Sequence, residues 1–129
     1  CGLKRWGQVK DQLETPYFKE HCKNILAPFI SQIIDYFQNG YEISACIGVD
    51  GSPSCGVNST CRSKQWGVEI DSSLSLEKLI KSVEKVEEEG VFIEVFKKLL
   101  DEHKIDIKFL AIDEANPKNS IENLLKELR

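Results

Sequence analysis

Stretches with the apolar spacing of helices alternate along this chain with short apolar runs, and no other feature constrains its fold as strongly. Residues 41–49 (YEISACIGV) and 107–112 (IKFLAI) are rich in β-formers and are typical of buried strands. Helical spacing dominates residues 15–40 and 75–103. Because helices that alternate with buried strands cover a parallel sheet, we expect an α/β fold with a small, mostly parallel, doubly wound sheet.

Local signals mark the ends of the first helix. Thr15 is a suitable cap, Pro16 suits the first helical position, and Asn39-Gly40 closes the helix. Pro28 lies inside the run, so we expect it to kink the helix or divide it in two. Seven apolar residues follow the helical spacing: Phe18, Cys22, Ile25, Leu26, Phe29, Ile33 and Phe37.

The rest of the chain predicts three more helices and a loop. Residues 50–66 form a Gly/Ser/Pro/Cys-rich loop, and a short strand is expected at residues 66–70. A third helix is expected from Val91 to about His103, and a capping box at residues 119–122 opens a last one. The second helix begins after Ser75, ends in the acidic run EKVEEEG, and is marked by Leu76, Leu79, Ile80, Val83 and Val86.

The composition excludes several classes of protein. The 129 residues, of which 41% are hydrophobic and 29% charged, are expected to form a single domain over residues 1–129. The net charge of -4 offers no basic patch, so we expect no nucleic-acid partner. No apolar run approaches the roughly 18–20 residues of a membrane span, and the first residues do not resemble a signal peptide. Five cysteines beside a good aliphatic core suit a reducing compartment, so we expect a cytoplasmic protein.

The sheet is expected to be larger than the two secure strands. The sequence begins at Cys1 and contains no Met, so we expect a preceding segment that carries an N-terminal strand. A sheet of few strands would also gain from pairing, which makes a homodimer an expected assembly.

Three cysteines and a tight turn follow the first strand in the stretch CIGVDGSPSCGVNSTCRS, residues 46–63. Sites in parallel α/β sheets form beyond the carboxyl ends of the strands, so chemistry is expected here. A phosphatase-type Cys-x5-Arg loop fits poorly because Arg62 comes one residue late after Cys55. The cysteine gaps do not match the Cys-x2–4-Cys pairs of structural zinc. An iron–sulfur site remains, with the amides of Gly51 and Gly56 near the cluster sulfides; the other interpretation is a plain turn with buried thiols.

The stretches GLKRWGQVKDQLETPYFKEHC, CIGVDGSPSCGV and EGVFIEVFKKLL together resemble a shorter branch of the 2-thiouracil desulfidase family. The resemblance covers nearly the whole chain. It implies a Rossmann-like, three-layer α/β domain that carries a four-iron–four-sulfur cluster. In that family three cysteines hold the cluster, and the fourth iron stays open to take the sulfur of a thiocarbonyl substrate. Water then replaces the sulfur by oxygen, and sulfide is released.

The resemblance also implies ligands. Cys55 matches the ligand of the Ser-Pro-Ser-Cys-Gly turn, and either Cys1 or Cys61 joins it as a second ligand. Cys1 lies near the family's Cys-Pro-Glu ligand, but Gly2 follows it here, and the family's first ligand has no counterpart. Cys22 and Cys46 are interpreted as buried thiols.

Further residues are candidates for the reaction itself. Ser52 and Ser54 match the motif serines, which could position water or donate to the cluster, and which also suit an ordinary turn. Asp50 is a candidate general base or a turn-forming residue, and Arg5 and Trp6 are candidates for the substrate pocket. The expected activity is removal of sulfur from a small thiocarbonyl compound. The alternative is a non-catalytic domain that binds or senses iron–sulfur or sulfide, or a metal-free binding module.

Overall fold

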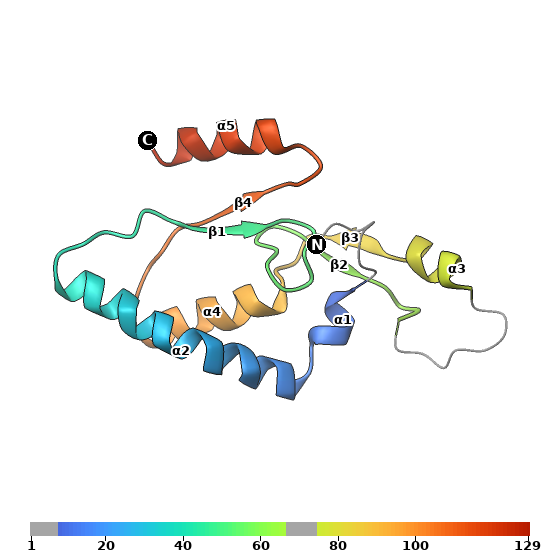
Figure 1. The fold of residues 1–129 in the computed structure, drawn as a ribbon, viewed down its shortest axis with the longest axis horizontal. Coiled ribbons are helices and arrows are strands. Elements are labelled where there is room, and N and C mark those ends of the chain that lie inside the picture. Colours follow the sequence, from blue (N-terminus) through green and yellow to red (C-terminus); the bar gives the residue numbers. More distant parts are fainter. Residues whose placement is uncertain (1–7, 67–74) are drawn as a thin grey trace.

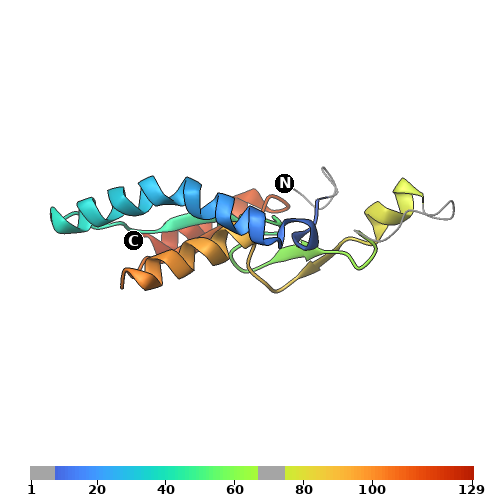
Figure 2. The same cartoon turned by 90° about the horizontal axis from the view of Figure 1, so that it is seen from below.

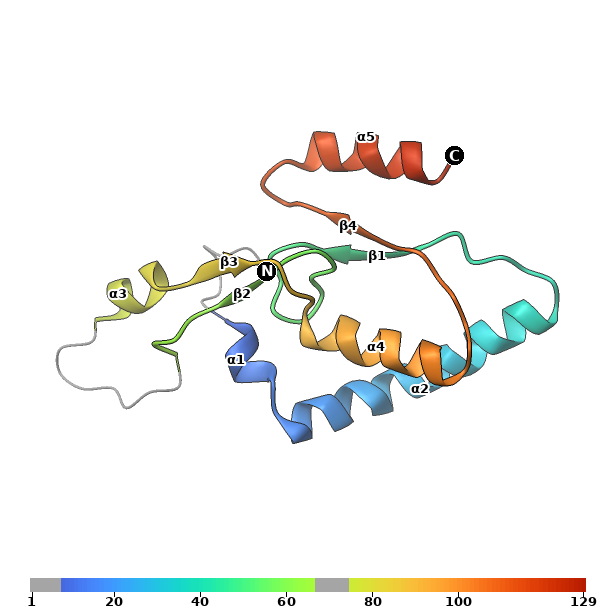
Figure 3. The ribbon, with the colours of Figure 1, turned by 180° about the vertical axis from the view of Figure 1, so that it is seen from behind.

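The computed structural model describes residues 8–66 and 75–129, which form a mixed α/β protein with a small parallel sheet (Figure 1). Strands β1 (Cys46–Val49) and β4 (Phe109–Ile112) make up this sheet. Helices α2 (Pro16–Gln38) and α4 (Val91–Glu102) lie along one side of the strands, and α5 (Pro117–Glu127) lies along the other (Figures 1 and 3). The expected α/β class is confirmed at this level.

The parallel pairing places the carboxyl ends of both strands at one edge. Cys46 pairs with Phe109 and Val49 with Ile112, so the two strands run in register over their whole length. Just beyond β1, the amide of Asp50 donates to the carbonyl of Ile112 at 2.9 Å. The loop after β1 therefore starts at the sheet edge where sites of parallel α/β proteins form.

Helix α2 is one continuous helix of 23 residues. Thr15 caps it as predicted, because its side-chain oxygen accepts the amide of Phe18 at 3.2 Å, and Pro16 occupies the first turn. Of the two predicted effects of Pro28, a kink or a division, the division is wrong. Pro28 lies on the exposed side of α2, where water can satisfy the carbonyl that proline leaves without a donor.

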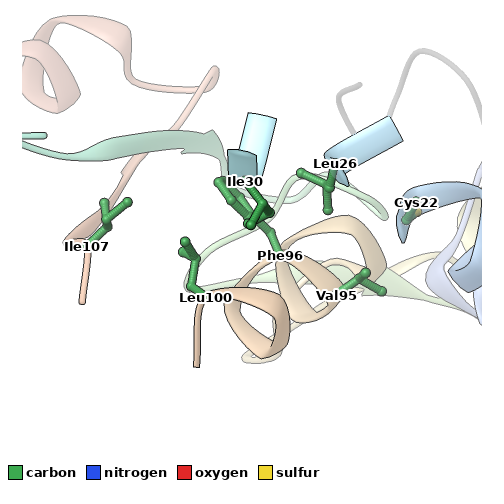
Figure 4. Packing of buried hydrophobic residues seen from close by; sticks show 7 residues of the cluster. All are labelled: Cys22, Leu26, Ile30, Val95, Phe96, Leu100 and Ile107. Carbon is green, nitrogen blue, oxygen red and sulfur yellow. The ribbon is translucent and has the colours of Figure 1, made fainter. Parts of the chain in front are cut away.

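The core lies between α2, α4 and the parallel strands (Figure 4). On α2, residues four apart line up toward α4, because side chains at this spacing share a helix face. Ring contacts join α4 to β4, with Phe96 edge-on to Phe109 at 5.6 Å between centroids. The buried members of the cluster are Cys22, Leu26, Ile30, Val95, Phe96, Leu100 and Ile107.

A second, antiparallel pair of strands corrects two predictions. Strand β2 (Thr60–Arg62) forms within the expected loop, and β3 (Glu84–Val86) replaces the end of the expected second helix. Helix α3 (Leu76–Lys81) is correspondingly short and ends at Ser82, whose hydroxyl donates to its own helix at the carbonyl of Leu79. The paired residues of β2 and β3 are more than 20 positions apart in the sequence, so local patterns do not reveal that the two strands pair. Beyond Trp66, the strand expected at residues 66–70 falls outside the described residues.

The remaining helices differ from the sequence pattern in detail. Helix α1 (Lys10–Leu13) was not predicted. Helix α5 begins at Pro117, two residues before the expected capping box, because a proline in the first turn suits the start of a helix. Figure 2 shows how the β2–β3 pair and α3 extend from the rest of the molecule. Among the helices of the described residues, none is both long and apolar enough to cross a membrane.

Candidate functional site

The loop after β1 is folded tightly on itself by backbone hydrogen bonds. The amide of Val49 donates to the carbonyl of Cys55 at 2.8 Å, and the amide of Gly51 donates to the carbonyl of Ser59 at 2.9 Å. The amide of Gly56 donates to the carbonyl of Ser52 at 3.2 Å. The two glycine amides that were expected near cluster sulfides therefore already have partners inside the loop.

Asp50 organises this loop through its carboxylate. Its Oδ1 accepts the successive amides of Val57, Asn58 and Ser59 at 3.1, 2.8 and 3.3 Å, and its Oδ2 accepts the side-chain amide of Asn58 at 3.0 Å. Partial burial acts to raise the pKa of Asp50, but these hydrogen bonds together outweigh it and hold the pKa below its usual value. A carboxylate bound in this way is a weak base, so the geometry favours the turn-forming interpretation of Asp50.

The two motif serines have different surroundings. Ser52 is 1% exposed; its hydroxyl oxygen accepts the amide of Cys55 at 3.1 Å, and its carbonyl accepts the hydroxyl of Thr60 at 2.8 Å. Ser54 is half-buried, and its Oγ lies 3.2 Å from the sulfur of Cys55 and 3.4 Å from the hydroxyl of Ser52. Ser52 thus stabilises the turn, whereas Ser54 carries the hydroxyl beside the Cys55 thiol.

Burial singles out one end of the loop. From Gly51 to Val57, every residue is buried except Ser54 and Cys55. The carbonyls of Pro53 and Ser54 accept amides from the first turn of α4, so this end of the loop is held between β1 and α4. The loop therefore presents one thiol and one hydroxyl on an otherwise enclosed backbone.

Cys61 does not face this position. It is 1% exposed on β2, and its thiol donates to the carbonyl of Gln8 at 3.1 Å. Burial raises the pKa of Cys61, and the charge of Asp11 raises it further. A thiol that is buried, bonded to a carbonyl and reluctant to ionise is a poor metal ligand.

The thiols near Cys55 are instead Cys22 and Cys46. Burial raises the pKa of both groups, and the proximity of Cys55 raises it further. Cys22 is buried in the core on α2, as interpreted. Cys46 packs against that core from β1 but is only half-buried. The sequence did not predict that these two thiols lie near Cys55. The one available signal was that Cys46 and Gly48 are two residues apart and therefore share a face of the strand.

A cluster of charged side chains near the loop was also missed. Lys10 is 1% exposed, and its Nζ pairs with Glu94 and lies 3.2 Å from Oε2 of Glu88. The guanidinium of Arg62 bonds Glu88 at 2.7 Å and Asp11 at 3.1 Å. Arg62 is thus bound by carboxylates. The sequence offered no signal, because surface and buried lysines look alike in it.

The described residues satisfy the requirements of a three-cysteine cluster only in part. Cys55 is partly exposed, but no group of three His, Cys, Asp or Glu side chains within residues 8–66 and 75–129 could hold a metal ion. Cys1, Arg5 and Trp6 lie outside the described residues. A cavity of about 270 Å³ lies between α2 and α4, but its lining residues do not include any residue of the Cys55 loop.

Comparison with known proteins gives one short match. A stretch of 56 residues is 30% identical to an uncharacterized protein of Methanocaldococcus jannaschii and covers 43% of this chain. The stretch spans about a third of that relative, 35% of its length. No model of a protein family matches the chain, and neither does any solved structure. Because the relative is itself uncharacterized, the match carries no activity over to this chain.

Proposed function

We propose that the protein is a desulfidase-like enzyme that replaces the thiocarbonyl sulfur of a small molecule by oxygen. Water supplies the oxygen, and its two hydrogens leave with the sulfur as hydrogen sulfide, so the exchange needs no oxidant or reductant. The observation that carries the proposal is the GSPSCG loop at the carboxyl end of β1. On that loop only Ser54 and Cys55 escape burial, and the Ser54 hydroxyl lies 3.2 Å from the Cys55 sulfur. The resemblance in sequence adds the type of substrate and a Rossmann-like architecture.

The proposed cofactor is a four-iron–four-sulfur cluster with Cys55 as one ligand. The described residues do not by themselves provide the three cysteines, so no step of the reaction is derived through the cluster. Cys61 is unsuited because its buried thiol is bonded to the carbonyl of Gln8, and this favours Cys1 as a further ligand. A cytoplasmic location suits the proposal, since the free thiols of Cys22, Cys46, Cys55 and Cys61 persist in a reducing compartment.

Each residue of the loop has a distinct part in the proposed site. Cys55 provides the sulfur ligand, and the hydroxyl of Ser54 beside it holds and orients the attacking water. Ser52 and Asp50 stabilise the backbone through their bonds to the amides of the loop. The proposal thus assigns chemistry to Ser54 and Cys55 and support of the backbone to Ser52 and Asp50.

The test is an assay of iron and acid-labile sulfide, with the visible spectrum, on protein purified without oxygen. We expect about four irons and four sulfides per chain. Cys55→Ala should lose them, whereas the matched control Cys61→Ala should retain them. Absence of iron in the wild-type protein after cluster reconstitution would overturn the cofactor, and retention in Cys55→Ala would overturn the role of Cys55.

Release of sulfide from 2-thiouracil and from smaller thioamides tests the reaction itself. Turnover that is lost in Cys55→Ala supports the enzyme. Iron binding without release of sulfide from any thiocarbonyl compound would contradict the enzyme and support a non-catalytic domain that binds or senses iron–sulfur.

A further inference from the structure

The first turn of α4 binds the loop that carries Cys55. The amide of Val91 donates to the carbonyl of Pro53 at 3.1 Å, and the amide of Phe92 donates to the carbonyl of Ser54 at 3.0 Å. The amide of Gly90 donates to the carbonyl of Gly56 at 2.9 Å. Loop carbonyls thus take the place of a capping side chain, and α4 has no side-chain cap of its own.

Gly90 makes this close approach possible. Its φ of -74° and ψ of 157° are accessible to any residue, so the backbone conformation does not require glycine. Space does require it. A Cβ atom at position 90 would lie 2.3 Å from the carbonyl carbon of Ser54, 2.4 Å from its oxygen and 2.8 Å from the amide nitrogen of Cys55. These are backbone atoms, so no change of side-chain rotamer relieves the overlap.

Gly48 has the same role on the opposite side of Cys55. A Cβ atom at position 48 would lie 2.4 Å from the carbonyl oxygen of Cys55. The neighbouring residue, Val49, donates its amide to that same oxygen at 2.8 Å. The backbone at Cys55 is therefore enclosed between β1 and α4, each of which approaches it at a glycine and bonds it through the following residues.

We infer that Gly48 and Gly90 are positioning residues for Cys55. Restoring an ordinary contact from 2.3 Å requires the Ser54–Cys55 peptide to move by about 1 Å. The two glycines thus set the place of the Cys55 sulfur at the sheet edge from sites 7 residues before and 35 residues after it. The inference rests on the proposed function only in taking Cys55 as the reactive group, and it holds whether or not the site binds iron.

The test measures the alkylation rate of Cys55 by iodoacetamide in folded, metal-free protein, read from the modified peptide by mass spectrometry. The variants are Gly48→Ala and Gly90→Ala. The control is Gly40→Ala, where φ is 78° and no atom lies within 4 Å of the added Cβ. That control strains the backbone without touching the loop. We expect the rate at Cys55 to change by about tenfold or more in both loop variants, because a shift of about 1 Å alters the exposure of the thiol and its contact with the Ser54 hydroxyl, and thiol reactivity depends on both access and ionisation. It should change less than about twofold in Gly40→Ala.

A further variant separates positioning from loss of fold. Val91→Pro keeps a residue suited to the first helical position, but it deletes the amide that bonds Pro53 and places the proline ring against the Pro53 carbonyl. It therefore displaces the loop from the α4 side with no atom added at position 90. A changed rate at Cys55 with unchanged helix content supports the inference. Unchanged rates in all folded variants would overturn it. Unfolding of Gly48→Ala, Gly90→Ala and Val91→Pro alike would also overturn it, since the glycines would then serve the whole fold rather than the thiol.

Discussion

Replacement of Asp50 by Asn tests whether the charge of the Asp50 carboxylate stabilises the Cys55 loop. The carboxylate accepts three backbone amides and the side-chain amide of Asn58. Asn keeps one acceptor oxygen of similar shape but removes the charge, and it places a second amide group against Asn58. Bonds to a charged acceptor contribute about 1 kcal/mol more than neutral ones. Three such bonds on a half-exposed group, discounted for solvent, give a loss of about 2 kcal/mol.

The loss is measured as the free energy of unfolding in urea and as the melting temperature. For 129 residues, about 2 kcal/mol corresponds to a fall of about 7 °C. The matched control is Asp106→Asn at an exposed aspartate, which should change the melting temperature by less than about 2 °C.

The pH dependence follows from the direction of the pKa shift. The folded-state pKa of Asp50 is lowered, so its carboxylate stabilises the fold fully above the unfolded pKa of about 3.9. That stability is lost as the pH falls through the folded pKa. The gap between wild type and Asp50→Asn should therefore be widest at pH 7 and shrink below about pH 4. Equal stabilities at pH 7, or a gap that persists unchanged at pH 2.5, would refute the reasoning.

Two more substitutions address the charged cluster. Lys10→Met should lower the free energy of unfolding by less than about 2 kcal/mol, because Met fills the buried space of the lysine and the half-exposed carboxylates of Glu88 and Glu94 regain water. A loss above about 4 kcal/mol in urea unfolding would contradict this reasoning. Arg62→Lys should lower the free energy of unfolding by about 1 kcal/mol in low salt, since Lys cannot bond Glu88 and Asp11 at once. The loss should be smaller in 1 M salt, because salt screens exposed ion pairs, and a loss independent of salt would argue against an ionic origin.

Much of the fold followed from short-range patterns. The spacing of Cys22, Leu26 and other apolar residues predicted α2, and Thr15 with Pro16 predicted where it begins, because both signals depend on neighbours within one or two turns. The apolar runs predicted β1 and β4, and their alternation with helices predicted the parallel pairing. The β2–β3 pair was not predicted, since nothing in the sequence near Thr60 shows that its partner is Val86.

The candidate site, like the fold, could be predicted from the sequence only in part. The GSPSCG turn after a buried strand was visible in the sequence, because strand, glycines and serines are contiguous. The sequence could not rank Cys61 against its neighbours, because burial depends on which face of β2 meets α1. Nor could it show that Asp50 is bound by amides seven to nine residues away.

The sequence by itself determined the type of fold, the strand that leads into the thiol loop and the presence of Cys55 at its tip, since hydrophobic periodicity and turn chemistry act locally. The tertiary structure alone decided that Ser54 and Cys55 are the two residues between Gly51 and Val57 that are not buried, that Cys61 is buried and bonded to the carbonyl of Gln8, and that Gly90 lies against the Cys55 peptide. The physical reason is that burial and steric contact arise between segments far apart in the chain. Here the distant segments are the Cys55 loop and α4, and no local pattern of the sequence encodes how α4 packs on the loop.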